Sequence, residues 1–202
     1  MTDAVVYDEQ GLIPCVTQDW ATGEVLTLAY MNADALRLTL ATREIHFFSR
    51  SRQELWRKGG TSGNVMRLRR LRYDCDADAL VALVEPAGPA CHTGERTCFY
   101  RDLEGERTLA PHEALAALER TIRERRDERP EGSYTAELLA DPGRIGDKVR
   151  EEADEVARAA AGESDERLAE EAADVLYHLE VLMQSRDVPL AAVLEVLNDR
   201  RR

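Results

Sequence analysis

The hydrophobic pattern of this 202-residue chain changes midway, so two different kinds of domain are expected. Up to about residue 101, apolar runs are short, often alternate with polar residues and are separated by loops with glycine or proline, which is typical of β-strands. From residue 112 onward, apolar residues recur at helical spacing instead. The charged segment between them, with Gly105 and Pro111, is the predicted linker. The predicted domains are residues 1–107 and 108–202.

The first domain is predicted to be a mixed, β-rich α+β domain. Asn32 and Asp34 can cap a short helix that runs through Leu36, Leu40 and Ala41. Strands are expected at residues 12–18, 24–31, 45–49, 65–73, 80–85 and 98–101.

The second domain is predicted to be all-α. Ser133 or Thr135 can cap a short helix, and Ser164, which two acidic residues follow, is a good start for a longer one. The helix that Ser164 caps is expected to end near residue 185. Further helices are expected at residues 112–126, 143–161 and 189–202.

Composition argues against several classes of protein. Apolar residues make up 44% of the chain and charged residues 33%, which suits packed cores under a solvated surface. The net charge of −12 argues against a nucleic-acid partner, because such binding depends on neutralising phosphates. No run approaches the roughly 20 apolar residues that span a bilayer, and no secretory signal is visible. A cytoplasmic protein with no membrane partner is therefore expected.

Acidic residues form two motifs in the helical half, EExxE over residues 151–155 and ExxD over residues 171–174. On the first helix, Glu152 falls inside the predicted apolar face and Glu155 beside it, whereas Glu151 points roughly 100° away from Glu152. The residues that set this face are Ile145, Val149, Val156 and Ala160.

On the second helix, Glu171, Asp174 and His178 flank a predicted apolar stripe. Carboxylates at the margin of a core need a partner, and nearby cations are too few to pair with all of them. Mg²⁺ bound by oxygen ligands and bridging substrate phosphates meets that need, and a solvated acidic face is the alternative. The predicted stripe consists of Leu168, Ala172, Val175, Leu179 and Met183.

Cys75, Cys91 and Cys98 supply three thiolates, and three protein ligands plus a water form the pattern of catalytic zinc. Cys91 and Cys98 can converge locally, whereas Cys75 must come from elsewhere in the fold or from a second subunit. His92 can be a fourth ligand, a general base or a structural residue; beside a zinc-bound water we favour the base. Cys15 is expected to be a buried thiol, since disulfides are rare in a reducing compartment.

Asp74, Asp76 and Asp78 place three carboxylates at alternate positions, which would share one face of a strand. Together with Glu85 their spacing matches an EF-hand loop. Ala79, however, occupies the position that needs glycine, and no exit helix is expected, so we reject an EF-hand.

Residues 49–64 are predicted to bind an anion, because guanidinium groups, hydroxyls and glycines are closely spaced there. Trp56 adds an aromatic face, and the only lysines of the chain are Lys58 in this segment and Lys148 in the helical half. An exposed basic strand is the alternative. The predicted substrate-binding residues are Ser49, Arg50, Arg52, Trp56, Lys58, Ser62 and Lys148.

The helical half carries the stretches Gly132-Ser-Tyr-Thr135, Lys148-Val-Arg-Glu-Glu152, Glu155 and Glu171-Ala-Ala-Asp-Val-Leu-Tyr-His178. In these stretches it resembles the all-α nucleoside-triphosphate pyrophosphatases, and more closely phosphoribosyl-ATP pyrophosphohydrolase. The resemblance implies hydrolysis of phosphoribosyl-ATP to phosphoribosyl-AMP and pyrophosphate. The implied magnesium ligands are Glu152, Glu155, Glu171 and Asp174, with Glu151 as a further candidate.

The first half carries the stretches Tyr30-Met-Asn32, Ser49-Arg-Ser-Arg52, Leu55-Trp-Arg-Lys-Gly59, Ser62-Gly-Asn64, Asp74-Cys-Asp-Ala-Asp78, Cys91-His-Thr-Gly94 and Cys98-Phe99. In these stretches it resembles phosphoribosyl-AMP cyclohydrolase, which opens the purine ring of phosphoribosyl-AMP at N1–C6. The resemblance implies a homodimer that shares zinc between subunits, and it implies Mg²⁺ near the three aspartates. The implied zinc ligands are Cys75, Cys91 and Cys98.

The two resemblances together predict a bifunctional hydrolase of histidine biosynthesis, in which Arg50, Arg52 and Lys58 bind phosphates. Two other classes remain open. One is a house-cleaning nucleotide pyrophosphatase fused to a zinc-bearing regulatory module, which activity of residues 1–110 on phosphoribosyl-AMP would exclude. The other is a non-enzymatic zinc-dependent scaffold, which would bind metal without turnover.

Overall fold

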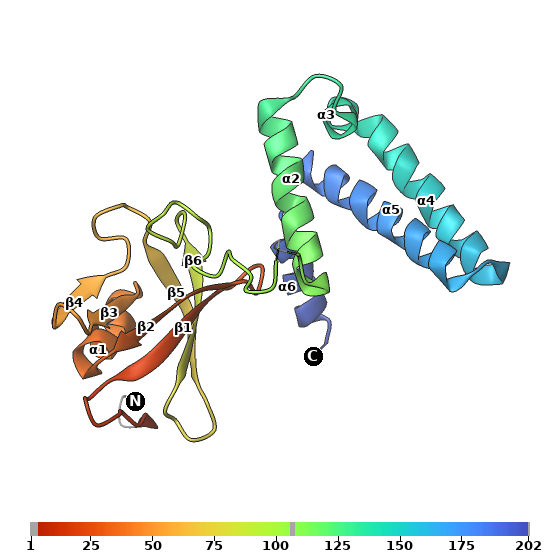
Figure 1. The fold of residues 1–202 in the computed structure, drawn as a ribbon. Coiled ribbons are helices and arrows are strands. Elements are labelled where there is room, and N and C mark those ends of the chain that lie inside the picture. The colour runs from red at the N-terminus through yellow and green to blue at the C-terminus, as the bar shows by residue number, and fades with distance from the viewer. Residues whose placement is uncertain (1–3, 106–107, 202) are drawn as a thin grey trace. The chain divides into compact units, whose positions relative to one another are not determined.

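The computed structural model describes residues 4–105 and 108–201. It divides the chain into two compact units, Met1–Thr108 and Leu109–Arg202 (Figure 1). The boundary predicted after residue 107 adjoins residues 106–107, which lie outside the described residues. Among the described residues, no helix has both the length and the apolar content needed to span a membrane.

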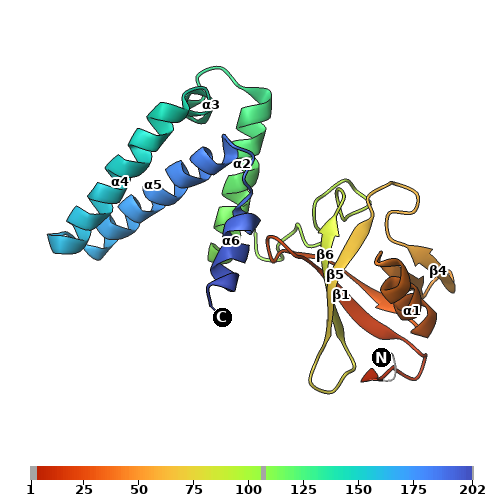
Figure 2. The same cartoon turned by 180° about the vertical axis from the view of Figure 1, so that it is seen from behind.

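The first unit is a six-stranded mixed sheet with one helix, which confirms the predicted β-rich α+β domain (Figures 1 and 2). The strands lie in the order β4-β3-β2-β1-β6-β5; β1 pairs in parallel with β6, and the other neighbouring strands are antiparallel. Their bounds are β1 Ile13–Asp19, β2 Val25–Met31, β3 His46–Ser49, β4 Glu54–Arg57, β5 Met66–Tyr73 and β6 Leu80–Pro86.

One face of this sheet and the helix α1 (Ala33–Thr42) enclose the core of the first unit. Alternate residues of β1 are buried, because successive side chains of a strand point to opposite faces. Asn32 begins α1 as predicted, since its side chain accepts a hydrogen bond from the amide of Ala35 (2.9 Å). Cys15 is fully buried in the core, and this burial raises the pKa of its thiol to about 12.

Two predictions about strands are wrong. No strand forms at residues 98–101: the amide of Cys98 bonds to the carbonyl of Leu26 (2.8 Å), but Phe99 then turns out and is 54% exposed. Conversely, β4 lies within the segment expected to be a loop. It forms because Gln53 adopts a positive φ of 55°, which reverses the chain and pairs β4 with β3.

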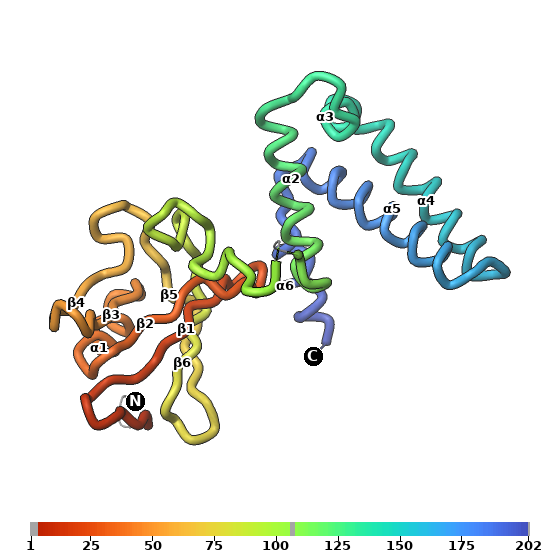
Figure 3. Tube along the Cα trace, viewed as in Figure 1, coloured from red at the N-terminus to blue at the C-terminus, as the bar shows by residue number. Residues whose placement is uncertain are grey.

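The second unit is all-helical, as predicted, with α2 Ala114–Glu128, α3 Tyr134–Leu139, α4 Pro142–Gly162, α5 Asp165–Gln184 and α6 Leu190–Asp199. The side chain of Ser133 caps α3 by accepting from the amide of Ala136, and Ser164 caps α5 in the same way at Arg167. A short 3₁₀ turn, Pro111–Glu113, precedes α2. Helices α4 and α5 lie side by side along most of their length, as the tube in Figure 3 shows.

The predicted apolar faces of α4 and α5 are partly wrong. On α4, Ala159 is buried, whereas Ala160 is exposed. On α5, Leu179 is 37% exposed, whereas Glu171 and His178 are buried. Helix α5 therefore turns part of its polar face toward α4 and leaves part of its apolar stripe uncovered within the described chain.

Candidate active sites

A cavity of about 570 Å³ in the first unit gathers residues from two separate stretches of the sequence. One wall comes from β4 and the glycine-rich loop that follows it, and the other from the loop after β6. Six of the predicted site residues line the cavity, namely Arg52, Trp56, Lys58, Ser62, Cys91 and His92.

The glycine-rich wall of this cavity is fixed by a close backbone approach. Gly59 has a φ of 79°, and a Cβ placed on it would lie only 2.2 Å from the carbonyl carbon of Asn64. Just before it, Lys58 donates from Nζ to the carbonyl oxygen of Ala90 (2.6 Å), which ties this wall to the cysteine loop. The ring of Trp56 packs against Phe47 with centroids 5.2 Å apart.

Ser49 and Arg50 line a neighbouring hollow of about 380 Å³, which shares Trp56 with the first cavity. The guanidinium of Arg50 lies 3.9 Å from the ring centroid of Tyr30, a cation–π contact. The structure thus divides the predicted anion-binding residues between two adjoining hollows.

Cys91 and Cys98 lie close to each other, as predicted, since each thiol contributes to the pKa shift of the other. The hydroxyl of Thr93 donates to Sγ of Cys91 (3.1 Å), and this bond lowers the pKa of the Cys91 thiol. Desolvation raises the pKa of Cys98. His92 is exposed at the cavity, with Nδ1 3.9 Å from Sγ of Cys91, so a hydrogen bond between them is weak.

Cys75 lies in an exposed turn before β6, whereas Cys91 follows the end of that strand. The seven residues of β6 between them span roughly 20 Å, at about 3.3 Å for each residue of a strand, so the two cysteines belong to loops at opposite ends of β6. Among the described residues, no group of three potential metal ligands includes a cysteine. One chain therefore presents two of the three predicted thiolates together and the third elsewhere.

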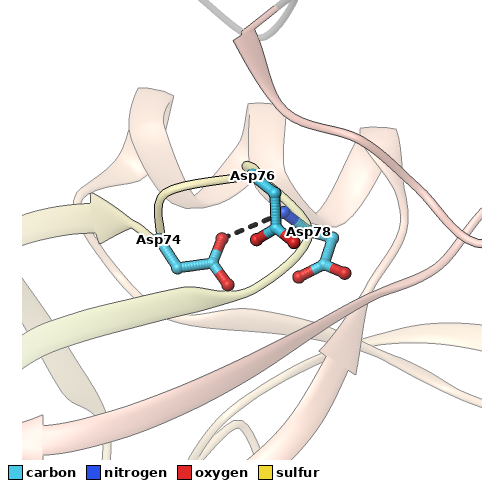
Figure 4. A group of neighbouring side chains, drawn as sticks. All are labelled: Asp74, Asp76 and Asp78. Atoms are coloured by element: carbon cyan, nitrogen blue, oxygen red, sulfur yellow. Dashed lines mark hydrogen bonds between the residues drawn. The ribbon is translucent and has the colours of Figure 1, made fainter.

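Asp74, Asp76 and Asp78 gather their carboxylates in that same turn, with ligand atoms within 4.8 Å of one another (Figure 4). The turn, with a φ of 64° at Ala77, brings them together in place of the strand face considered from the sequence. Oδ1 of Asp74 accepts from the amide of Asp78 (3.0 Å). Repulsion from Asp76 and then Asp74 raises the pKa of Asp78, which is the electrostatic signature of a site that a cation would stabilise.

In the second unit, Glu152, Glu155 and Glu171 form a carboxylate trio between α4 and α5, with ligand atoms within 4.8 Å of one another. Glu152 is 7% exposed and Glu171 only 3%. Desolvation raises the pKa of Glu171, although Arg167 lies against it as an ion partner. Three converging acids, two of them nearly buried and Glu155 partly exposed, form a site that suits a hard divalent cation.

Besides Arg158, whose Nη2 lies 2.9 Å from Glu155, Lys148 is a cation of α4 that pairs with this trio. Its Nζ lies 2.8 Å from Glu151 and 3.1 Å from Glu152, and these bonds raise the pKa of the lysine above its usual range. Glu151 is exposed and outside the trio, as its predicted orientation required. Asp174 is also exposed, and the structure does not gather its carboxylate with the other three.

His178 was given no role from the sequence, yet it connects the trio to the start of α3. Its Nδ1 donates to the carbonyl of Asp174 (2.9 Å) and lies 3.7 Å from Glu152. Nε2 then accepts from the hydroxyl of Tyr134 (3.3 Å). The detectable signal was the spacing of Asp174 and His178, four residues apart on one helix.

A second contact between α3 and α5 joins Thr135 and Tyr177, whose hydroxyls share a 2.8 Å hydrogen bond. The rings of Tyr134 and Tyr177 stack with centroids 6.5 Å apart. The two sequence motifs 132–135 and 171–178 are thus in direct contact beside the carboxylates.

Comparisons with known proteins assign the two units separately. The family model of phosphoribosyl-AMP cyclohydrolase matches residues 27–100, and that of phosphoribosyl-ATP pyrophosphohydrolase matches residues 115–201. The histidine biosynthesis bifunctional protein HisIE of Bacillus subtilis (strain 168) is 50% identical over 199 residues, which cover 98% of this chain and 95% of that protein. The protein of the same name from Thermus thermophilus is 54% identical over 178 residues, covering 87% and 82% respectively. The chain therefore belongs to the bifunctional hydrolases of histidine biosynthesis, which join a phosphoribosyl-AMP cyclohydrolase to a phosphoribosyl-ATP pyrophosphohydrolase.

Proposed function

We propose that the two sites act in sequence, the later part of the chain first. The helical unit hydrolyses phosphoribosyl-ATP to phosphoribosyl-AMP and pyrophosphate, and the first unit then opens the purine ring at N1–C6. The observation that carries this assignment is that each matched unit holds its own cluster of metal-ligating side chains. The functional boundary lies near residue 107, between the two sites.

In the helical unit, Glu152, Glu155 and Glu171 hold Mg²⁺, because their carboxylates already converge where little water reaches them. When bound, magnesium neutralises phosphate charge and polarises water toward phosphorus. Asp174 is exposed on the next turn of α5 and completes the ligand set. Lys148 turns its ammonium from Glu151 toward the phosphates of the substrate.

His178 keeps Glu152 in place during this reaction. Its Nδ1 donates to the carbonyl of Asp174, which fixes the ring 3.7 Å from the Glu152 carboxylate and limits where that carboxylate can move. Tyr134 holds the other ring nitrogen. The motif at the start of α3 thus orients a metal ligand on α4 through a histidine on α5.

In the first unit, Cys91, Cys98 and Cys75 hold zinc. The donor set fits, because two thiols are adjacent and a third thiol is exposed. When bound, zinc supplies a nucleophilic water near neutral pH. His92 accepts a proton from the attacking water, since it lies on the cavity wall next to Cys91.

The cavity residues position phosphoribosyl-AMP. Arg52, Lys58 and Ser62 bind phosphate on one wall, and Trp56 offers its ring to the base. Ser49 and Arg50 contact the substrate from the adjoining hollow, which Trp56 connects to the first. The three aspartates hold Mg²⁺ in the exposed turn before β6, which does not line this cavity within one chain.

A homodimer completes the zinc site, because the separation along β6 prevents Cys75 from reaching Cys91 within one chain. Exposed apolar side chains support association in both units. Phe99 is 54% exposed beside the cysteine loop, and Leu176 is 46% exposed on α5.

The decisive experiment feeds phosphoribosyl-ATP to the pure full-length protein and identifies products by mass. We expect pyrophosphate and a nucleotide heavier than phosphoribosyl-AMP by one water. Glu152→Gln should release no pyrophosphate but should still open supplied phosphoribosyl-AMP. Cys75→Ser should release pyrophosphate and accumulate phosphoribosyl-AMP, while Cys15→Ser should behave as wild type.

Two outcomes would favour other functions. Pyrophosphate release from many nucleotides without ring opening would indicate a house-cleaning pyrophosphatase with a regulatory zinc module. Zinc binding without either reaction would indicate a scaffold.

A further inference from the structure

Arg96 lies in the loop between the two adjacent cysteines and forms ion pairs with two acidic residues of the sheet. Its Nη2 lies 2.6 Å from Oδ2 of Asp19 at the end of β1, and its Nε bonds to Glu24 just before β2. The side chains of Asp19 and Glu24 are only 7% and 10% exposed. We call these three residues the arginine clamp.

The residues after Arg96 continue the attachment to β2 in register. The hydroxyl of Thr97 donates to the carbonyl of Val25 (2.6 Å), and the amide of Cys98 donates to that of Leu26 (2.8 Å). Cys98 is therefore held at a fixed point along β2.

The backbone of Arg96 also reaches the other cysteine. Its carbonyl accepts from the amide of Ala90 (3.0 Å), and the amide of Cys91 donates to the carbonyl of Glu95 (3.0 Å). Arg96 thus bonds to the sheet through its side chain and to the segment bearing Cys91 through its main chain. The separation of the two thiols depends on both attachments.

The clamp depends on a guanidinium group. Two nearly buried carboxylates in one place need a partner, and the planar fork of arginine can bond both of them at once. A lysine at this position keeps the charge but presents a single point of contact. If a neutral residue replaces Arg96, the carboxylates of Asp19 and Glu24 lose their guanidinium partner in a place that little water reaches. The loop must then move for water to reach them.

We propose that Arg96, held by Asp19 and Glu24, positions Cys91 and Cys98 for zinc, an inference that rests on the proposed zinc site. Arg96 touches neither thiol, so it is a positioning residue.

The test compares full-length wild type with Arg96→Gln and Arg96→Lys. The matched control is Arg37→Gln, which removes an exposed ion pair with Asp34 on α1. Zinc affinity is measured by competition with a chromophoric chelator, and the cobalt-substituted proteins give the thiolate-to-metal absorption band. We expect Arg96→Gln to lose about 10–100-fold in zinc affinity with an altered cobalt spectrum, Arg96→Lys to be intermediate, and the control to match wild type.

A second measurement needs no metal. Dibromobimane becomes fluorescent when it bridges two neighbouring thiols. In a Cys75→Ser background the pair it can reach is the exposed Cys98 and Cys91, which is 8% exposed and lines the cavity, whereas Cys15 is fully buried in the core. We expect slower bridging when Arg96→Gln is added. A cooperative unfolding transition followed by the fluorescence of Trp20 and Trp56, both in the first unit, verifies that each variant is folded.

The outcomes separate the two proposals. Wild-type zinc affinity, cobalt spectrum and bridging rate in Arg96→Gln would overturn the positioning role while leaving the zinc site intact. A wild-type chain that binds no zinc would overturn the zinc site and this inference together. If Arg96→Gln does not fold, Glu24→Gln replaces it, because that change weakens the same clamp and leaves Asp19 paired.

Discussion

Replacing Gly59 by alanine tests whether the backbone of Gly59 lies as close to the backbone of Asn64 in solution as it does in the structure. The residue has a φ of 79°, and an added Cβ would lie 2.2 Å from the carbonyl carbon of Asn64 and 2.4 Å from the amide nitrogen of Val65. These are backbone atoms, so no side chain can rotate to relieve the overlap. Gly63 is the matched control, because its φ is 80° but nothing lies within 4 Å of the added atom.

The expected loss of folding stability is larger for Gly59→Ala than for Gly63→Ala, because only the change at Gly59 creates an overlap with the backbone. A left-handed conformation costs an alanine about 1–2 kcal/mol, which is the whole expected effect of Gly63→Ala. Displacing the backbone near Asn64 adds about 1–3 kcal/mol in Gly59→Ala. In a unit of this size these values lower the midpoint of thermal unfolding by about 10 °C for Gly63→Ala and about 20 °C for Gly59→Ala.

Tryptophan fluorescence can measure this unit alone, because both tryptophans of the chain, Trp20 and Trp56, lie in it. The two half-reactions are assayed separately at a temperature where every variant is folded. We expect Gly59→Ala to slow ring opening, since moving the backbone displaces Lys58 in the cavity wall, and to leave pyrophosphate release unchanged. Equal unfolding shifts for Gly59→Ala and Gly63→Ala would show that the approach to Asn64 is not maintained in solution.

Three further predictions concern the helical unit. Glu152→Gln and Asp174→Asn should abolish pyrophosphate release and spare ring opening, whereas Glu151→Gln should have a milder effect. A coupled pyrophosphate assay measures this, and equal losses at 151 and 152 would contradict the orientation of α4. Lys148→Arg should cost about tenfold or more in the same assay, since the ammonium bonds a metal ligand; wild-type kinetics would make it incidental. Without metal, protonated Glu171 stabilises the fold below its usual pKa of 4.5, and this contribution should be lost as pH rises through its raised pKa. The check is the midpoint of thermal unfolding measured in EDTA over a range of pH. Glu171→Gln is the control and should show no such pH dependence, and added Mg²⁺ should reverse the trend in the wild type.

Local patterns in the sequence were sufficient to predict a feature where the residue that stabilises it is only a few positions away in the chain. The cap at Asn32 acts on an amide three residues away, and Ser164 does the same at the start of α5. The two capping predictions needed only a local pattern. The buried thiol expected at Cys15 is explained by the structure, which places it at one of the alternate buried positions of β1.

The cavity could not be derived in the same way, because its two walls are distant in sequence. Lys58 and Ala90 are 32 residues apart, yet their hydrogen bond joins the walls. The same limit explains the missed strand β4, whose burial is slight and whose existence depends on pairing with β3. The clamp joins Arg96 to Asp19, 77 residues away, and no local pattern announces it.

The wrong prediction of the buried face of α5 has a different origin. The apolar residues do recur at helical spacing, but the prediction assumed that another element of the same chain covers them. An apolar stripe predicts that something covers it, yet says nothing about whether the cover belongs to the same chain. Burying a leucine is worth about 2 kcal/mol, so a helix that leaves Leu176 and Leu179 exposed while burying Glu171 acts against the hydrophobic term. Arg167 already pairs with the buried acid, and the metal proposed above would compensate its charge further. The two faces of α5 thus accord with the proposed magnesium site on one side and with the proposed homodimer on the other.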